Sequence, residues 1–249
     1  MCNELSQEDK NAKGSILVAT PGVQDGHINI TSLPGECRVA TIPTPKATST
    51  GMLMAIGLIY LEDRRLVVLA GYESGHAALW QQNSTARWEC IYMNKAHSQP
   101  VMSLDHALAL GCFFTSSADA VITRHPLRRD ESHTKSMQTK HAGQQSLIVR
   151  SDEKIFATAG WDGRVRVYSP KSMKELAVLK WHKEGCYAVA FAAVYEDTAG
   201  SSESADTDRD ASMIPRNLTV SEQRVQKART THWLTAGSKD GKISLWNIY

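Results

Sequence analysis

The chain has 249 residues, of which 42% are hydrophobic and 22% charged, and its formal net charge is +2. This composition is typical of a soluble globular protein and argues against a polybasic chain that binds nucleic acid or an anionic membrane in bulk. No apolar run approaches the ~18 residues of a membrane-spanning helix. The five cysteines include no CxxC pair, which argues against a disulfide framework or a zinc site.

The first 14 residues are polar and lack the apolar core of a secretory signal, so we expect a disordered tail over 1–14. From residue 15 onward, short apolar runs alternate with turns, which is the pattern of an all-β protein. The expected strands and hairpins, in chain order, are 15–20, 27–33, 36–42, 52–61, 65–72, 76–80, 87–93, 98–108, 112–125, 136–140, 144–151, 155–159, 164–168, 174–180, 186–194 and 232–249.

Five hairpin turns recur along the chain, at positions 25, 74, 119, 162 and 240. An Asp-Gly pair between alternating apolar residues, as at Asp162 and Gly163, is a strong hairpin signal, because glycine supplies the positive φ of a primed turn. The first three intervals are 49, 45 and 43 residues, at or just above the ~40–45 residues of a WD repeat.

The fourth interval, 78 residues, is too long because residues 195–230 form a polar insertion of 36 residues. Without this insertion the interval is 42 residues. We therefore expect a disordered insertion at 195–230, between the first and second strands of the fifth repeat. It is either a solvated loop or a docking or phosphorylation segment around Ser201, Ser202 and Ser204.

These spacings predict a WD-repeat β-propeller over residues 15–249, in which each repeat forms one four-stranded blade. Three repeats are complete. The first repeat lacks its first strand and the fifth lacks its last, so about five repeats are present, two of them partial. Since an open ring leaves strand edges unpaired, we expect about two further N-terminal blades outside this chain.

WD repeats typically contain a hydrogen-bonded row of a histidine, a serine or threonine, the turn aspartate and a tryptophan, and this chain resembles them at several positions. His125 and Tyr168 stand where the third and fourth repeats would have tryptophan, and Ala236 interrupts the fifth row. We expect these rows to be structural, because they satisfy buried polar groups. The row residues are His97, Thr115 and Asp119, then His141, Thr158 and Asp162, and finally His182, Asp240 and Trp246.

No motif of a hydrolase, metalloprotease, P-loop or dinucleotide-binding protein is present, and the periodic histidines belong to different blades. We therefore expect no catalytic residues, no metal, no cofactor and no small-molecule substrate. Loops held by rigid sheets are common binding sites, and an exposed tryptophan is a frequent anchor. The candidate partner-binding residues, on turns at one face of the disc, are Tyr72, Glu73, Trp161, Arg164 and Lys239.

Four segments carry a more specific resemblance: HSQPVMSLD with FFTSSADA, TKHAGQQSLIVRSDEKIFATAGWDGRVRVY, KELAVLKWHKEGCYAVAFA and AGSKDGKISLWNIY. They resemble the ASTRA-associated protein 1 family of fungal WD-repeat proteins, and the likeness extends over most of 15–194 and 231–249. The resemblance implies a seven-bladed propeller. It also implies a non-enzymatic scaffold in the nucleus, whose partners are other subunits of the ASTRA complex, without direct contact to nucleic acid or membrane.

The same resemblance implies roles in chromatin remodelling, telomere maintenance and the maturation of PI3K-like kinases. Two other adaptor functions stay open: a substrate receptor of a ubiquitin ligase, or a signalling propeller like G-protein β. A hydrolytic propeller enzyme is a third alternative.

Overall fold

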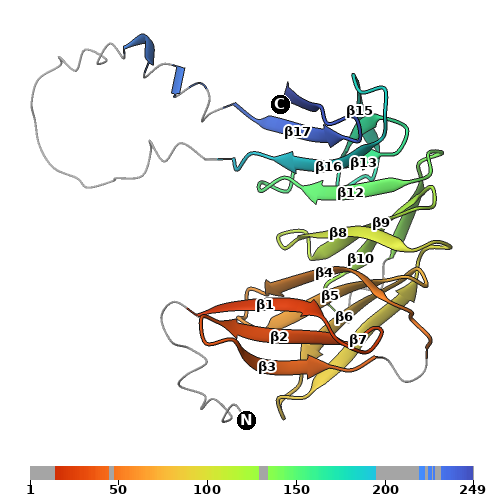
Figure 1. The fold of residues 1–249 in the computed structure, drawn as a ribbon, viewed down its shortest axis with the longest axis vertical. Helices are drawn as coiled ribbons and strands as arrows, with labels where there is room; N and C mark the ends of the chain where they lie inside the picture. Colours follow the sequence, from red (N-terminus) through yellow and green to blue (C-terminus); the bar gives the residue numbers. More distant parts are fainter. Residues whose placement is uncertain are drawn as a thin grey trace, which may run out of the picture.

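The computed structural model describes residues 15–44, 48–128, 134–194, 219–221, 224–225, 227 and 231–248. Its strands form five antiparallel sheets, and Figure 1 shows the sheets following one another through the molecule in chain order. Each sheet is built from strands that are consecutive in sequence, so the chain completes one sheet before it begins the next.

The first sheet contains β1 (Ile16–Pro21), β2 (Ile28–Leu33) and β3 (Cys37–Ile42). The second contains β4 (Leu53–Tyr60), β5 (Leu66–Tyr72), β6 (His76–Gln82) and β7 (Trp88–Lys95). The third contains β8 (Val101–Ala107), β9 (Cys112–Ser117), β10 (Val121–Pro126) and β11 (Lys135–Gln138). The fourth contains β12 (Gln144–Val149), β13 (Phe156–Gly160), β14 (Arg164–Tyr168) and β15 (Glu175–Lys180), and the fifth contains β16 (Cys186–Phe191), β17 (Trp233–Ser238) and β18 (Ile243–Asn247).

The hydrophobic core lies between neighbouring sheets, because successive side chains of a strand point to opposite faces. In β5, Val68 and Ala70 pack toward the first sheet, whereas Val67 and Leu69 pack toward the third. The second strands β5, β9 and β13 are therefore buried almost throughout, while the residues of the outer strands β7, β11 and β15 are half-buried or exposed.

Aromatic side chains fill the core between the third and fourth sheets. The ring of Phe114 stacks on that of Phe156 with centroids 4.8 Å apart, and Phe156 stacks on Tyr168 at 5.1 Å. Tyr168 thus occupies the tryptophan position of the fourth repeat as a buried aromatic.

The predicted all-β WD-repeat propeller is confirmed, with three four-stranded sheets and two three-stranded sheets in the described residues. The hairpin turn after β13 also forms, with Gly163 at φ 74°. β16 and β17 pair although 41 residues separate them, so the insertion lies between the first and second strands of the fifth sheet, as predicted.

The predicted disordered segments lie mostly outside the described residues, and for 1–14 and 195–218 the prediction stays a prediction. Within the rest of the insertion, the described residues Val220, Ser221, Arg224, Val225 and Lys227 are helical. Among the described residues, no helix is both long enough and apolar enough to cross a membrane.

Candidate interaction surface

The row predicted for the third repeat forms a continuous chain of hydrogen bonds. His97 Nδ1 lies 3.2 Å from Asp119 Oδ1, and His97 Nε2 lies 2.8 Å from Thr115 Oγ1. The same threonine oxygen lies 2.8 Å from His125 Nε2. The chain then continues to the second sheet, because the Tyr92 hydroxyl on β7 lies 2.9 Å from His125 Nδ1 and 2.7 Å from Thr134 Oγ1.

The Asp119 carboxylate at the end of this series of hydrogen bonds determines which atoms carry the protons. Burial lowers the pKa of His125 to about 3 and also lowers the pKa of His97, so both rings are neutral near pH 7. The Asp119 carboxylate only accepts, so His97 donates from Nδ1 and accepts from Thr115 at Nε2. His125 then donates from Nε2 to Thr115, as a tryptophan indole would, and accepts the Tyr92 proton at Nδ1.

The row predicted for the fourth repeat is wrong for His141. The Thr158 hydroxyl donates to Gln144 Oε1 at 2.7 Å, and Gln144 Nε2 donates to the backbone oxygen of His141. The His141 side chain is 38% exposed, and its Nδ1 lies 3.8 Å from Asp162 Oδ2. Asp162 instead accepts two hydrogen bonds from the buried guanidinium of Arg166, at 3.1 and 2.6 Å, so the longer arginine takes the place of the histidine.

In the fifth repeat, the predicted row of His182, Asp240 and Trp246 is wrong for the hydrogen-bond partner of His182. His182 Nε2 lies 2.6 Å from Ser244 Oγ on β18, and Ser244 is directly opposite Ala236 in the sheet. A serine on the third strand thus supplies the hydroxyl that Ala236 cannot. Asp240 accepts the backbone N–H of Lys242 at 3.1 Å and pairs with its ammonium, and the ring of Trp246 lies 6.2 Å from that of His182.

Tyr72 is not a partner-binding residue, because it is fully buried in β5. Its hydroxyl accepts a hydrogen bond of 3.2 Å from the indole of Trp80, and burial raises its pKa to about 12. Tyr72 therefore belongs to the interior of the second sheet. Its hydroxyl accepts from the tryptophan, as the serine or threonine hydroxyl does in a WD row. Glu73, the next residue, accepts the backbone N–H of Met52 at 3.1 Å.

Trp161 is at the surface, in the turn between β13 and β14, with 45% of the residue exposed. Its indole N–H donates to Gln145 Oε1 at 2.9 Å, and its ring lies over Gly143, where an added Cβ would come within 2.2 Å of the ring. The glycine therefore makes room for the ring, which is held in place on one side and open on the other.

A loop between the fourth and fifth sheets, residues 181–185, joins the neighbouring turns. Gly163 approaches the backbone oxygens of His182 and Glu184, and the backbone N–H of Lys239 donates to the oxygen of Gly185 at 2.9 Å. Arg164, half-buried, and Lys239, exposed, therefore lie on the same side of the molecule as Trp161.

Two aromatic residues that the sequence did not single out extend this surface. Trp181 is 56% exposed and follows Lys180, which is paired with Arg164 beside the turn. Tyr187, 45% exposed, is the second residue of β16, which begins directly after the loop. The sequence did contain a signal for them. The loop after the fourth strand of a blade lies beside the hairpin turns, so exposed aromatic residues in and next to this loop were candidates too. We call Trp161, Trp181, Tyr187, Arg164 and Lys239 the turn face.

The turn face has the composition of a protein-binding surface, with rigid aromatic side chains among cations. Within the described residues, no group of three or more histidine, cysteine, aspartate or glutamate side chains could hold a metal ion. The buried histidines are used in hydrogen bonds between strands, which is a structural role.

Comparison with known proteins agrees with this architecture. The family model "WD domain, G-beta repeat" matches residues 133–169 and 225–247. ASTRA-associated protein 1 of Penicillium rubens is 45% identical over 94% of this chain and 63% of its own length. The protein of that name from Pyricularia oryzae is 35% identical over 99% of this chain and 71% of its own. Guanine nucleotide-binding protein subunit beta-like protein 1 of Mus musculus is 31% identical over 95% and 64%.

Sheets of consecutive antiparallel strands, joined by inter-sheet cores and buried polar rows, define a WD-repeat β-propeller protein. The chain spans 63% of the length of the Penicillium relative. Because it is 35% identical to the Pyricularia relative over 71% of that protein, it belongs to the ASTRA-associated protein 1 family.

Proposed function

We propose that this chain is a non-enzymatic scaffold subunit of the ASTRA complex, which binds other subunits through the turn face. Family membership supports the identity of the assembly, since the relatives carry its name. We propose further that the protein acts in the nucleus, with roles in chromatin remodelling, telomere maintenance and maturation of PI3K-like kinases. Its contacts are with proteins, and not with nucleic acid, membrane or a small-molecule substrate.

The observation that carries the binding role is the exposed, fixed aromatic pair of Trp161 and Trp181. Large aromatic side chains dominate binding energy when their rotamers are fixed before the partner arrives, because less conformational entropy is lost. Trp161 is fixed by Gln145 and Gly143, and the Trp181 ring meets that of His182 edge-on at 4.8 Å. Both rings still present surface to a partner.

The test is affinity purification of the full chain from a fungal nuclear extract, followed by mass spectrometry. We expect ASTRA components to be recovered with the wild-type chain, and at least about fivefold less with Trp161→Ala or Trp181→Ala. Leu176→Ala is the matched control, because Leu176 is also exposed on β15 but at the end remote from the turn. Recovery of cullin-type ligase subunits without ASTRA components would contradict the proposal.

The stability of Trp161→Ala has to be measured beside its binding. The substitution removes one exposed hydrogen bond and part of the packing on Gly143, so we expect a loss of about 1 kcal/mol in the free energy of unfolding. Unfolding of the variant under native conditions would instead place Trp161 in the core.

A second candidate is a signalling propeller of the G-protein β-like kind, which the similarity to the mouse protein favours. Recovery of signalling proteins in the same purification, with ASTRA components absent, would support it. Both candidates are adaptor functions and use the same surface.

A further inference from the structure

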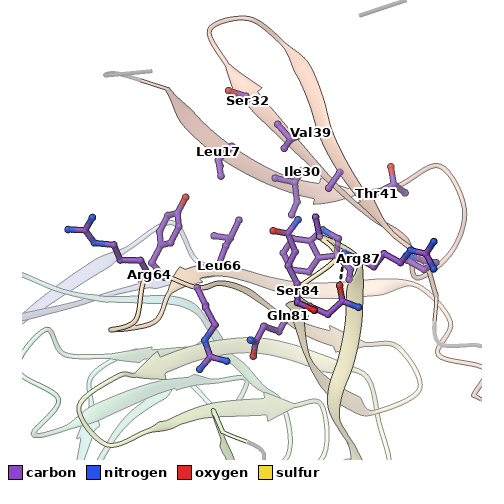
Figure 2. Close-up of a pocket in the computed structure, with 18 residues that line it drawn as sticks. Leu17, Ile30, Ser32, Val39, Thr41, Arg64, Leu66, Gln81, Ser84 and Arg87 are labelled. Atoms are coloured by element: carbon purple, nitrogen blue, oxygen red, sulfur yellow. Dashed lines mark hydrogen bonds between the residues drawn. The ribbon is translucent and has the colours of Figure 1, made fainter. Parts of the chain in front are cut away.

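A second surface feature lies away from the turn face, between the first and second sheets. It is a groove of about 1200 Å³, bordered by β1–β3 on one side and by the β4–β5 and β6–β7 turns on the other. Figure 2 shows its walls, with Leu17, Ile30 and Val39 above and Leu66 and Gln81 below.

The middle of the groove is apolar. Its lining includes the buried Ile30 and the half-buried Leu17, Val39, Leu66 and Trp88. Except for Leu66, these residues also pack in the core between the first and second sheets, so the apolar wall of the groove is continuous with that core. An aliphatic side chain placed there would lose its contact with water and gain contact with these residues. The apolar middle thus fits one or two aliphatic side chains.

The ends of the groove are cationic. Three arginines line it, Arg64, Arg65 and Arg87, and the lining contains no aspartate or glutamate. Arg65 is neutralised by Asp63, which accepts from its Nε at 2.6 Å. Among the described residues, Arg64 and Arg87 form no ion pair, and Figure 2 shows them on opposite sides of Leu66 and Ile30.

Both free arginines are held on tight turns. The backbone N–H of Arg64 donates to the oxygen of Leu61 at 2.8 Å. The side chain of Asn83 accepts the backbone N–H of Arg87 at 2.9 Å. The positions of the two turns are therefore fixed by hydrogen bonds, which keeps the two cations apart at the ends of the apolar wall.

Side chains that can donate hydrogen bonds also line the groove. The indole N–H of Trp88 is buried and has no partner within the described residues, and the amides of Gln81 and Gln82 line the same wall. A carboxylate or a peptide carbonyl in the groove would accept from the two glutamine amides.

We propose that this groove binds an extended segment of a partner protein in which one or two aliphatic residues are flanked on both sides by aspartate or glutamate. Arg64 and Arg87 would each pair with one flanking carboxylate, and the aliphatic residues would lie on Leu66 and Val39. Separate single arginines suit carboxylates, whereas a phosphate group is bound by clustered arginines. This inference goes beyond the turn face and does not depend on it.

The test is fluorescence anisotropy with the full 249-residue chain. The probe is a labelled peptide, Glu-Asp-Leu-Ile-Asp-Glu. Two comparison peptides replace its acids by lysine or its aliphatic pair by Gly-Ser. We expect the acidic aliphatic probe to bind at least about tenfold more tightly than either comparison peptide, with affinity that falls as salt rises.

Charge reversal of the two arginines locates the site. We expect Arg64→Glu and Arg87→Glu each to weaken binding at least about fivefold, because each replaces an attraction by a repulsion. Arg38→Glu is the matched control, since Arg38 is exposed on β3 but does not line the groove, and it should change affinity less than about twofold.

Three results would overturn the proposal: no saturable binding of the acidic probe, equal binding of the lysine peptide, or unchanged affinity in the Arg64→Glu, Arg87→Glu double variant. A phosphoserine version of the probe that binds more tightly than the carboxylate version would also contradict it. Trp161→Ala should leave binding of the acidic probe unchanged. Failure of the groove proposal can therefore be distinguished from failure of the proposal that the turn face binds ASTRA subunits.

Discussion

The bond between Tyr92 and His125 crosses from the second sheet to the third, and Tyr92→Phe removes it without changing the shape of the side chain. The variant leaves His125 Nδ1 without its donor at a position that is fully buried. An unsatisfied buried acceptor costs about 1–3 kcal/mol. Thr134 loses a partner as well, but it is only half-buried. We therefore expect the free energy of unfolding to fall by about 1–2 kcal/mol.

The assay is urea-induced unfolding at pH 7.5, in a double-mutant cycle with His125→Phe. When the acceptor is already gone, Tyr92→Phe should cost about 1 kcal/mol less than in the wild-type background. Tyr60→Phe is the control, because the Tyr60 ring is largely exposed and its hydroxyl has water available. A Tyr92→Phe variant as stable as the control, or an additive cycle, would refute the reasoning that this hydrogen bond between the sheets stabilises the fold.

Two other predictions concern stability. His125 has a pKa lowered to about 3 and His97 one lowered in the same direction, whereas an unfolded histidine titrates near ~6.5. As the pH is lowered, these histidines bind protons in the unfolded chain before they do so in the folded one. The free energy of unfolding is therefore highest above pH ~6.5 and falls toward pH 3, by at most about 1.4 kcal/mol per pH unit for each histidine. Urea midpoints measured from pH 7.5 to 4.5 check this, and a flat profile would contradict it. Gly163→Ala should cost at least about 2 kcal/mol, because φ is positive and the new Cβ would lie 2.8 Å from the oxygen of Glu184. Gly241→Ala, also at positive φ but with nothing within 4 Å, should cost about 1 kcal/mol, and equal thermal shifts would show that the close approach does not matter.

Local signals made the fold predictable from the sequence. The turn at Asp162 and Gly163 depends on backbone preferences of two adjacent residues, and its spacing to other turns fixes the repeat. The third row was predictable for a similar reason, since His97, Thr115 and Asp119 occupy the positions that the pattern requires.

The side-chain partners in the other rows were not predictable from position alone. Gln144 reaches Thr158 and Arg166 reaches Asp162, because longer side chains from neighbouring positions fill the space left by His141. Tyr72 is near a turn in sequence, but its direction in β5 is inward. The groove could not be predicted from the sequence, because its two walls come from different sheets and only the structure shows how those sheets are placed.

The polar row of the third sheet also has a consequence for how the molecule comes apart. In the described chain, strands of different sheets pack together where their sheets are neighbours, so the unfolding energetics resemble those of a one-dimensional array with a coupling at each junction. Directional bonds cross two of these junctions: Tyr92 to His125 joins the second sheet to the third, and the backbone N–H of Val149 on β12 donates to Asp105 on β8 at 2.7 Å, joining the third sheet to the fourth. The second, third and fourth sheets should thus exchange their amide hydrogens as one cooperative block, with the first and fifth sheets opening before them.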